Sequence, residues 1–361
     1  MKFVICGDMS VTDKSWDFFD TADEKAAFGD TLPLYAEADR AIVNLECAVT
    51  ESENKIKKYG PNLKAPINTA LTLKKAGFTD CMLANNHVFD FGIEGLNDTV
   101  KALEEQGLEY NGIGMNYEDS RKDHVIEKDG LTVAFIAVNE HEYTYAIENR
   151  MGVRPFDEFE TMDDIRKAKK KADKVIVLYH GGKEHSHYPS PRLVKACREM
   201  VRCGADAVIC QHSHCIGAYE KFEGAHILYG QGNFHFVGRL DTVDWNEGLI
   251  LKMNVEKTGI DIDFVPIKAE NGAIRLANAD EREIMLSQLA ERNAALADGS
   301  WRDRWVEFCE SVKPAYRKAA GFTKDSTPDE YQFFAHYFDC EAHSDVWREL
   351  FKTWNHTNEI K

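Results

Sequence analysis

Short apolar runs rich in β-branched residues recur along this chain and constrain its fold more than any other feature. Runs of this length and composition are typical of buried strands. Six of them are KFVIC (2–6), RAIVN (40–44), TDCMLA (79–84), LTVAFIAV (131–138), KVIVLY (174–179) and DAVIC (206–210). Between several of them, apolar residues recur at helical spacing, as at Leu96, Val100 and Leu103. This alternation predicts an α/β fold whose strands are covered on both faces.

Beyond residue 220 the predicted strands follow one another more closely. The runs are HILYG (226–230), GLILKMNV (248–255) and GIDIDFVP (259–266). The short connection from Glu256 to Gly259 predicts a hairpin, so we expect mixed sheets with α+β tendencies. From about residue 278 the sequence becomes helical and aromatic, with Trp301 and Trp305 on one helical face that indicates packing. We predict a sheet-containing domain at 1–270 and a helical C-terminal extension at 271–361 packed on it.

Composition argues against several classes of partner. The chain carries 44 Lys and Arg against 61 Asp and Glu, and its formal charge of -17 would repel phosphate backbones and anionic lipid. We therefore expect no nucleic-acid partner and no membrane anchor. The nine cysteines have no paired spacing, which fits a reducing compartment. No apolar signal segment or bilayer-spanning run is present in the sequence. We expect a cytoplasmic protein, and nothing in the sequence indicates its oligomeric state.

Polar residues able to bind metal ions stand directly after five of the predicted strands. In α/β sheets the carboxyl ends of the strands converge on one crevice, so these residues are expected to meet. Each one alone is better explained by a turn, a helix cap or a buried histidine. Their joint position at five strand ends favours a shared site. The residues are Asp8, Asn44, Glu46, Asn85, Asn86, His87, His180, His212 and His214.

The donor types indicate which ions this site would bind. Carboxylate oxygens, an amide oxygen and three imidazoles form a mixed set suited to Mn, Fe or Zn. His212 and His214 would point to opposite sides of a regular strand. In a turn they could instead serve two neighbouring ions, with Glu46 bridging them. Two ions about 3.5–4 Å apart can acidify a bridging water and clamp a phosphoryl group. We expect one or two divalent transition-metal ions as cofactor.

Two histidine motifs receive a different interpretation. In Cys210-Gln-His-Ser-His-Cys215, the first cysteine ends a predicted strand and should point into packing, and no second Cys/His pair lies at finger spacing. A zinc knuckle is therefore not expected. His185-Ser-His187 follows its strand at a distance and is predicted to lie in an exposed rim loop.

Two further segments have polar residues that could serve the pocket or their own loops. His141, Glu142 and Tyr143 follow the strand at 131–138 and could line the pocket, although turn polarity explains them as well. Asn233 is expected to cap its own loop through side-chain hydrogen bonds.

The order of these motifs resembles the CapA family, the poly-γ-glutamate capsule-biosynthesis proteins. That family looks like a branch of the calcineurin-like metallophosphoesterases. The resemblance spans roughly residues 2 to 265 and implies a four-layer αββα sandwich of mixed sheets, here with a helical C-terminal extension. The strongest matching parts are ANNHVFDFGIEGL (84–96), HGGKE (180–184), HSH (212–214) and GQGNF (230–234).

The resemblance also implies roles for single residues. Glu46 would be the carboxylate that bridges two ions, and Asp8 would bind the first ion together with His214. The second ion would be held by Asn86, His180 and His212.

His87 would face the substrate and protonate or stabilise the leaving oxygen, while Asn44, Asn85 and Glu184 would contact the substrate. The chain departs from calcineurin-like enzymes at Ser10, where a histidine is usual, and at Glu46, which replaces an aspartate.

Two functions are compatible with these features. The first is a metal-dependent hydrolase in which a metal-bound hydroxide attacks a phosphoester of a small anionic or phosphorylated substrate, assisted by His87. The second is an accessory protein of poly-γ-glutamate or capsule metabolism that binds an anionic ligand at the metal site without catalysis. Amide-bond chemistry on γ-glutamyl substrates would need a Ser or Cys nucleophile arrangement, which the sequence does not suggest.

Overall fold

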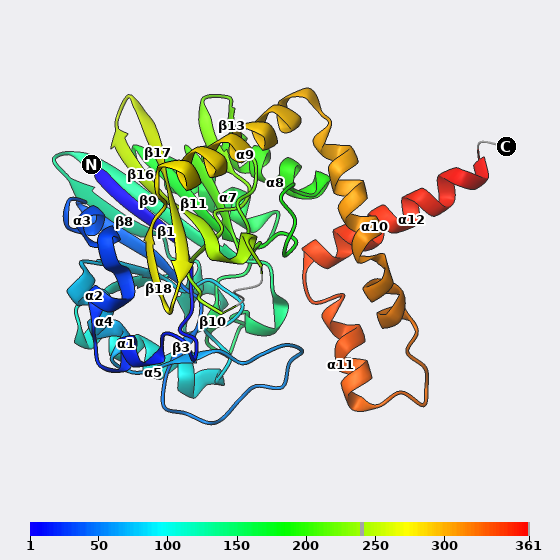
Figure 1. Cartoon of the computed structure of the whole chain (residues 1–361), viewed down its shortest axis with the longest axis horizontal. Helices are drawn as coiled ribbons and strands as arrows, with labels where there is room; N and C mark the ends of the chain where they lie inside the picture. Colours follow the sequence, from blue (N-terminus) through cyan, green and yellow to red (C-terminus); the bar gives the residue numbers. More distant parts are fainter. Residues whose placement is uncertain (239–241, 360–361) are drawn as a thin grey trace.

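Two large β-sheets lie face to face between layers of helices (Figure 1). The computed structural model describes residues 1–238 and 242–359, without the side chains of Glu142 and of residues 353–359. The first sheet has the order β18-β17-β16-β1-β2-β5-β6, with β15 paired to β1. Its strands are β1 (Lys2–Met9), β2 (Arg40–Leu45), β5 (Asp80–Met82), β6 (Glu109–Asn111), β15 (Asn233–His235), β16 (Glu247–Glu256), β17 (Gly259–Glu270) and β18 (Ala273–Leu276).

The second sheet has six strands in the order β13-β14-β12-β11-β9-β8. They are β8 (His124–Lys128), β9 (Leu131–Asn139), β11 (Lys174–His180), β12 (Ala207–Gln211), β13 (Tyr219–Phe222) and β14 (Ala225–Leu228). Two small ribbons pair β3 (Ala48–Val49) with β4 (Lys64–Ala65), and β7 (Ile113–Gly114) with β10 (Gly152–Val153). Parallel and antiparallel pairs occur in both large sheets, and the predicted hairpin is formed by β16 and β17, so the expected mixed sheets are confirmed.

Helices cover the outer face of each sheet. The first sheet is covered by α1 (Trp16–Asp20), α2 (Glu24–Phe28), α3 (Leu32–Ala36), α4 (Thr69–Ala76) and α5 (Gly92–Glu105). The second is covered by α7 (Glu160–Lys169) and α8 (Pro191–Cys203), while the short α6 (Tyr117–Ser120) packs beside β7 and β10. The helix–sheet–sheet–helix order is the four-layer arrangement expected from the resemblance, and the prediction of an α/β fold is confirmed.

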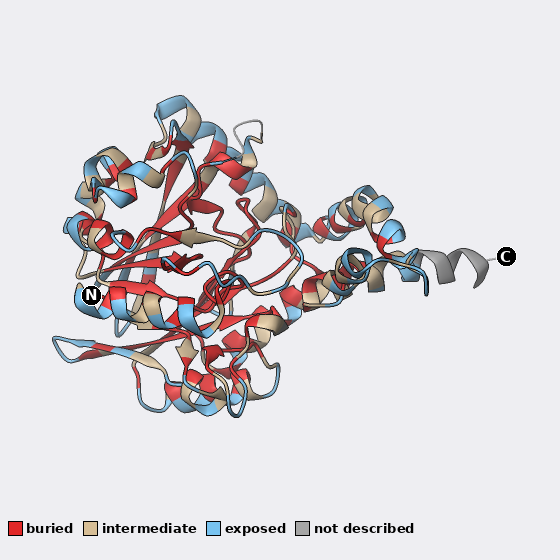
Figure 2. Cartoon of the chain, turned by 90° about the horizontal axis from the view of Figure 1, so that it is seen from below, coloured by how far each residue is buried: buried red, intermediate tan, exposed pale blue. Residues whose placement is uncertain are grey.

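The alternation of side chains along β1 shows why the layers form. Phe3 and Ile5 point between the sheets, where Phe3 meets Phe135 of β9 with ring centroids 5.2 Å apart. Val4 and Cys6 point the other way, into the cluster under α1–α5. Successive residues of a strand face opposite sides, so an apolar run without alternation needs a cover on both faces. Figure 2 accordingly shows the strands buried and the surrounding helices exposed on their outer sides.

The C-terminal helices form a separate layer at one side of the sheets. They are α9 (Ala279–Asp298), α10 (Trp301–Ala320), α11 (Pro328–His336) and α12 (Glu341–Glu359). Helix α9 packs on the core through Met285 and Leu289, whereas α10–α12 project beyond it around their own cluster, which includes Trp305 and Tyr316 (Figure 1). The sheet continues to Leu276, so the boundary expected at residue 270 falls inside the hairpin of β17 and β18.

The cysteines lie in the interior of the protein. All nine cysteines are buried thiols, and Cys210 packs in the core with its Sγ 3.7 Å from that of Cys197, as its place at the end of a strand predicted. No helix in the described part of the chain is both long enough and apolar enough to span a bilayer.

A buried ion cluster at the start of the strands joins the two sheets. Asp80 of β5 accepts hydrogen bonds from Arg40 Nε at 2.8 Å and Thr79 Oγ1 at 2.5 Å, and His124 Nε2 of β8 lies 2.7 Å from its Oδ1. Burial opposes ionisation of Asp80, but the hydrogen bonds from His124, Arg40 and Thr79 outweigh it and lower the pKa of this carboxyl. The cluster therefore stabilises the folded state when Asp80 is ionised.

We predict that Asp80→Asn lowers the free energy of unfolding by about 3 kcal/mol at neutral pH, the scale of breaking a buried ion pair. The pKa of Asp80 is lower in the folded state, so its contribution is present above the ordinary aspartate value near 3.9 and is lost as pH falls through the folded pKa. In urea unfolding, the difference in free energy of unfolding between the variant and wild type should be the same at pH 7 and pH 5. It should be smaller at pH 3.5. The exposed Asp261→Asn is the control, and a difference independent of pH contradicts the assignment.

Candidate metal centre

The parallel strands of both sheets deliver the predicted ligands to one place. Asp8 lies near the end of β1, Glu46 directly follows β2, and His180 ends β11. All three side chains are almost completely buried, at 0%, 0% and 1% exposure. Asp8, Glu46 and His180 each offer a ligand atom within 4.8 Å of the others. Both sheets thus contribute to one centre, although Asp8 and Glu46 belong to the first sheet and His180 to the second.

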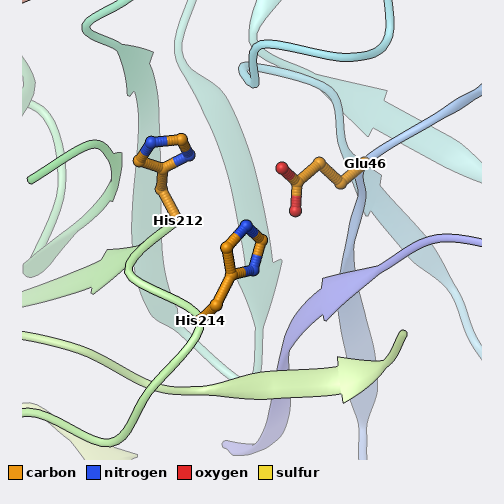
Figure 3. A group of neighbouring side chains, drawn as sticks. All are labelled: Glu46, His212 and His214. Atoms are coloured by element: carbon orange, nitrogen blue, oxygen red, sulfur yellow. The ribbon is translucent and has the colours of Figure 1, made fainter. Parts of the chain in front are cut away.

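Glu46 is the central residue of this centre. Its two carboxylate oxygens are buried and have no hydrogen-bond partner among the described residues, while His180 Nε2 lies 3.5 Å from Oε1. Glu46 also belongs to a second group, with His212 and His214, whose ligand atoms lie within 4.8 Å of one another (Figure 3). Burial, and then the neighbouring Asp8 carboxyl, raise the pKa of Glu46 well above its usual range. A cation between the two groups would supply the missing partner.

The turn after β12 brings His212 and His214 to the same side. Both have positive φ angles, 86° and 54°, which non-glycine residues rarely adopt outside sites that require a special backbone. In a regular strand these side chains would diverge, but β12 ends at Gln211 and both histidines lie beyond it. The structure places both next to Glu46, where a single ion could take both; the assignment of each histidine to a different ion stays a prediction.

A hydrogen-bonded network orients the remaining donors. Asp8 Oδ1 accepts from Asn44 Nδ2 and Asp8 Oδ2 from the His212 amide, both at 2.7 Å. His180 Nε2 lies 2.9 Å from Asn86 Oδ1, and its Nδ1 lies 3.0 Å from Asn44 Nδ2. His214 Nδ1 lies 2.9 Å from Asn233 Oδ1, and Asn233 Nδ2 donates to the Trp245 carbonyl, so these two hydrogen bonds position a candidate ligand and lead away from the loop that Asn233 was expected to cap. These contacts fix the rings before any ion binds.

Protonation states in this centre suit a cation. Burial raises the pKa of Asp8 to about 7, although hydrogen bonds from Asn44 and the His212 amide lower it in part. Burial and neighbouring imidazoles hold the pKa values of His180 and His212 well below the usual value, and burial lowers that of His214 to about 4. Neutral imidazoles are the form that binds metal, and a divalent ion would favour ionised carboxylates. The residues present therefore fit a divalent transition-metal ion.

Asn44 and Asn85, which were predicted to contact the substrate, lie in a hydrogen-bonded network behind the candidate ligands. Asn85 Nδ2 donates to Asn44 Oδ1 and to the Leu45 carbonyl, and its Oδ1 accepts from the amides of His87 and Val88. The side chain of Asn44 is engaged in the same way: its Nδ2 contacts Asp8 and His180, and its Oδ1 accepts from Asn85. Both side chains are fully buried behind the ligands, and neither lines the cavity. Their amides instead hold the strand-end loops in place. These hydrogen bonds suit both residues to position ligands, and their contact with a substrate stays a prediction.

A cavity of about 250 Å³ adjoins the centre. From the core it is lined by Asn86, His87, Glu184 and His212, together with His141 and Tyr143 of the loop after β9 and with Lys58 and Lys183. Tyr59, Gly60, Pro61 and Gly182 of the core also line it, and the C-terminal extension adds His336, Cys340, Ala342 and His343. Glu184 therefore stands where a substrate could contact it, while the side chain of Glu142 lies outside the described part of the chain.

His87 is held by a carboxylate and an ammonium group. Its Nδ1 lies 2.7 Å from Asp90 Oδ2 and 3.1 Å from Lys58 Nζ, and Lys58 also pairs with Asp90. Burial and the Lys58 charge lower the pKa of His87, while Asp90 opposes the shift. The ring is thus neutral near pH 7, with Nδ1 engaged and Nε2 as its remaining nitrogen.

Sequence reasoning missed the contribution of the C-terminal extension and of Lys58. The aromatic helices predict packing, yet His336, Asp339, Cys340 and His343 fall within eight residues, a density that could have raised the question. The predicted rim loop is only partly exposed: His185 is exposed, whereas Ser186 is buried and His187, whose Nε2 lies 3.1 Å from Asp244 Oδ1, is half-buried. Ser10, at the position of the missing histidine, is buried.

The fold has similarities among solved structures. A 5'-nucleotidase precursor from Thermus thermophilus is 14% identical, with a TM-score of 0.45 over 83% of this chain and 59% of that chain. A hypothetical protein from the same organism is also 14% identical, with a TM-score of 0.44 over 76% of this chain and 99% of that chain.

Sequence relatives give a sharper result. The "Capsule biosynthesis protein CapA" of Bacillus anthracis is 30% identical over 78% of this chain and 71% of its own length. The "PGA biosynthesis protein CapA" of Bacillus subtilis (strain 168) is 32% identical, over 56% of this chain and 55% of its own length. A "probable polyglutamine synthesis accessory protein" of Mycobacterium tuberculosis is 30% identical over 58% of this chain and 57% of its own. The chain thus spans little more than half of these last two relatives.

The motifs at the strand ends and these relatives lead to the same assignment. Residues 2–237, which hold every predicted ligand, match the family described as "Bacterial capsule synthesis protein PGA_cap". This chain belongs to that family.

Proposed function

We propose that this protein is a metal-dependent hydrolase of the calcineurin-like type, acting on a phosphoester or a related small anionic molecule. The buried, unpartnered carboxylate of Glu46 between two groups of imidazole and carboxylate donors is the observation that carries the proposal, drawn from the described residues. A bare carboxylate in this position is costly, whereas one or two divalent ions would stabilise it. Membership of a capsule synthesis family supports a substrate from anionic-polymer or envelope metabolism.

The chain's own residues would divide the work between ion binding and proton handling. Asp8, Glu46, Asn86, His180, His212 and His214 would hold Mn, Fe or Zn. Bound ions would supply Lewis-acid activation of a phosphoryl group and of an attacking water. Asn44 and Asn233 would orient ligands, and Glu184 with Lys183 lies at the cavity wall, where an anionic group would be admitted.

His87 would assist the departure of the leaving oxygen. Asp90 engages Nδ1, so Nε2 is left to exchange a proton at the cavity. Because burial and Lys58 lower the pKa of His87, the protonated, acid-donating form is populated at acidic pH. At neutral pH the ring would act through hydrogen bonding. The active form of a general acid here is therefore favoured on the acid side of neutrality.

The alternative is an accessory protein that binds an anionic ligand without turnover. Ser10 in place of the usual histidine favours it, because a ligand of one ion is missing. A relative named as a synthesis accessory protein is compatible with it. The cytoplasmic location expected from the sequence likewise remains a prediction.

We predict that Glu46→Gln raises stability in the absence of metal and abolishes stabilisation by metal. In chelator at pH 7.5, the variant should unfold at a higher temperature than wild type. The raised pKa of Glu46 means that ionisation above its ordinary value, near 4.3, weakens the fold, and glutamine removes that penalty.

Added Mn²⁺ should stabilise wild type but not Glu46→Gln. The gain in free energy of unfolding should be about 2.7 kcal/mol at 100 times the dissociation constant. Glu51→Gln, which changes an exposed residue, should behave as wild type, and His212→Ala should lose bound metal on elemental analysis. Equal Mn²⁺ stabilisation of wild type and Glu46→Gln would contradict the proposed centre.

We expect His87→Ala to lower kcat on phosphomonoesters or phosphodiesters by about 10²-fold, the lower end of what general acid catalysis contributes. The assay is a screen with Mn²⁺ in which metal content is measured in parallel. His185→Ala, an exposed histidine of the rim loop, is the matched control. Equal rates for wild type and His87→Ala at full metal occupancy would support the binding-only alternative.

The pH dependence tests the part played by Lys58. If His87 donates a proton, kcat falls as pH rises through its lowered pKa. Lys58→Met removes the positive charge that lowers that pKa, so the falling limb should move to higher pH. Lys57→Met, which changes an exposed neighbour, should leave the profile in place. A falling limb that does not move argues against His87 as the titrating acid.

A further inference from the structure

A second group of metal-binding side chains lies in the roof of the cavity. The turn between α11 and α12 carries Asp339 and Cys340, and it meets His141 of the loop after β9. Ligand atoms of these three residues lie within 4.8 Å of one another, although His141 is about two hundred positions away in the chain. Spacing in one helix therefore cannot explain the group; it forms where the extension closes over the core.

Two of the three donors are buried without a hydrogen bond. His141 Nδ1 and Asp339 Oδ1 have no hydrogen-bond partner in the part of the chain that the structure describes. The other carboxylate oxygen, Asp339 Oδ2, is engaged by His336 Nδ1 at 3.2 Å. One carboxylate oxygen, one imidazole nitrogen and the buried Cys340 thiol thus belong to the same small group of side chains. Buried polar atoms of this kind are normally satisfied, so a partner is missing here.

The group of His141, Asp339 and Cys340 differs from the ion cluster around Asp80. Asp80, Glu109 and His124 also lie close enough to hold an ion, but Arg40 already pairs with both carboxylates. Asp339 has only His336 as an ion-pair partner among the described residues. His141, Asp339 and Cys340 therefore keep donor atoms that no other described side chain engages, whereas the carboxylates of the Asp80 cluster are already paired.

We propose that His141, Asp339 and Cys340 bind a divalent transition-metal cation, with zinc as the best match, at a site distinct from the Glu46 centre. Zinc accepts mixed nitrogen, oxygen and sulfur donors, and tetrahedral ligand atoms around it lie about 3.3–3.8 Å apart, so modest closure of the three side chains would complete the contacts. On binding, the thiol proton of Cys340 passes to solvent and the sulfur–metal bond forms.

The position of the site gives it two consequences. His141 and Cys340 line the cavity, so the fourth coordination position would face the space beside the Glu46 centre. His141 also contacts His212, with ring centroids 4.6 Å apart, so the two centres adjoin. The ion would fasten the α11–α12 turn to the core, alongside the contacts of Asp345 with Ser190 and Arg192. The roof of the cavity would then depend on metal.

Cobalt substitution tests the site without any assay of activity. The full chain, stripped of metal and titrated with Co²⁺, should develop a near-ultraviolet thiolate-to-cobalt charge-transfer band, because Cys340 supplies a sulfur ligand. Cys340→Ser and Asp339→Asn should abolish the band. Cys309→Ser, a control for another buried thiol of the same extension, should keep it.

The double variant His212→Ala with His214→Ala separates this inference from the proposed function. It should lose the ions of the Glu46 centre and keep the thiolate band, since that centre contains no sulfur. A folded wild type without the band, or a band that survives Cys340→Ser, overturns the proposal. If Cys340→Ser does not fold by circular dichroism, His141→Asn supplies the same test, and persistence of the full band in it also overturns the proposal.

Discussion

The buried carboxylate of Glu46 is the interaction on which the rest of this structure depends. It stands where the two sheets meet, without a hydrogen-bond partner among the described residues, and it belongs to both groups of candidate ligands. The layers around it are built to hold it there: Asn44 links Asp8 and His180, and Asn85 holds the loop behind them. An isolated carboxylate would weaken the core, so this network makes physical sense around a cation.

The C-terminal extension gives the cavity its shape. The sheets by themselves present an open row of ligands, but the α11–α12 turn adds imidazoles and a thiol opposite them. The extension has its own small apolar cluster, and it meets the core through apolar residues of α9 and Trp301 as well as through polar contacts such as the bonds from Ser190 and Arg192 to Asp345. Access to the candidate centre therefore depends on how firmly this layer is attached, and so on the packing of α10–α12.

Much of the fold could be predicted from local pattern, and the reason is visible in particular strands. The run at 131–138 is apolar without alternation, and β9 is indeed covered on both faces. The short β18 escaped prediction because Ala273–Leu276 has too few residues to carry a pattern. The candidate ligands could be predicted because each follows a strand. The roles of Asn44 and Asn85 could not, because whether an amide faces a cavity or a network depends on neighbours from other strands.

The sequence by itself determined the longer strands, the four layers implied by family resemblance and the set of residues at the strand ends. Those properties are local: side-chain period and turn chemistry act over a few residues. Only the tertiary structure decided that His212 and His214 turn toward the same carboxylate, that Lys58 and Asp90 fix His87, and that the C-terminal helices close the cavity. These depend on contacts between segments far apart in the chain, which no local pattern encodes.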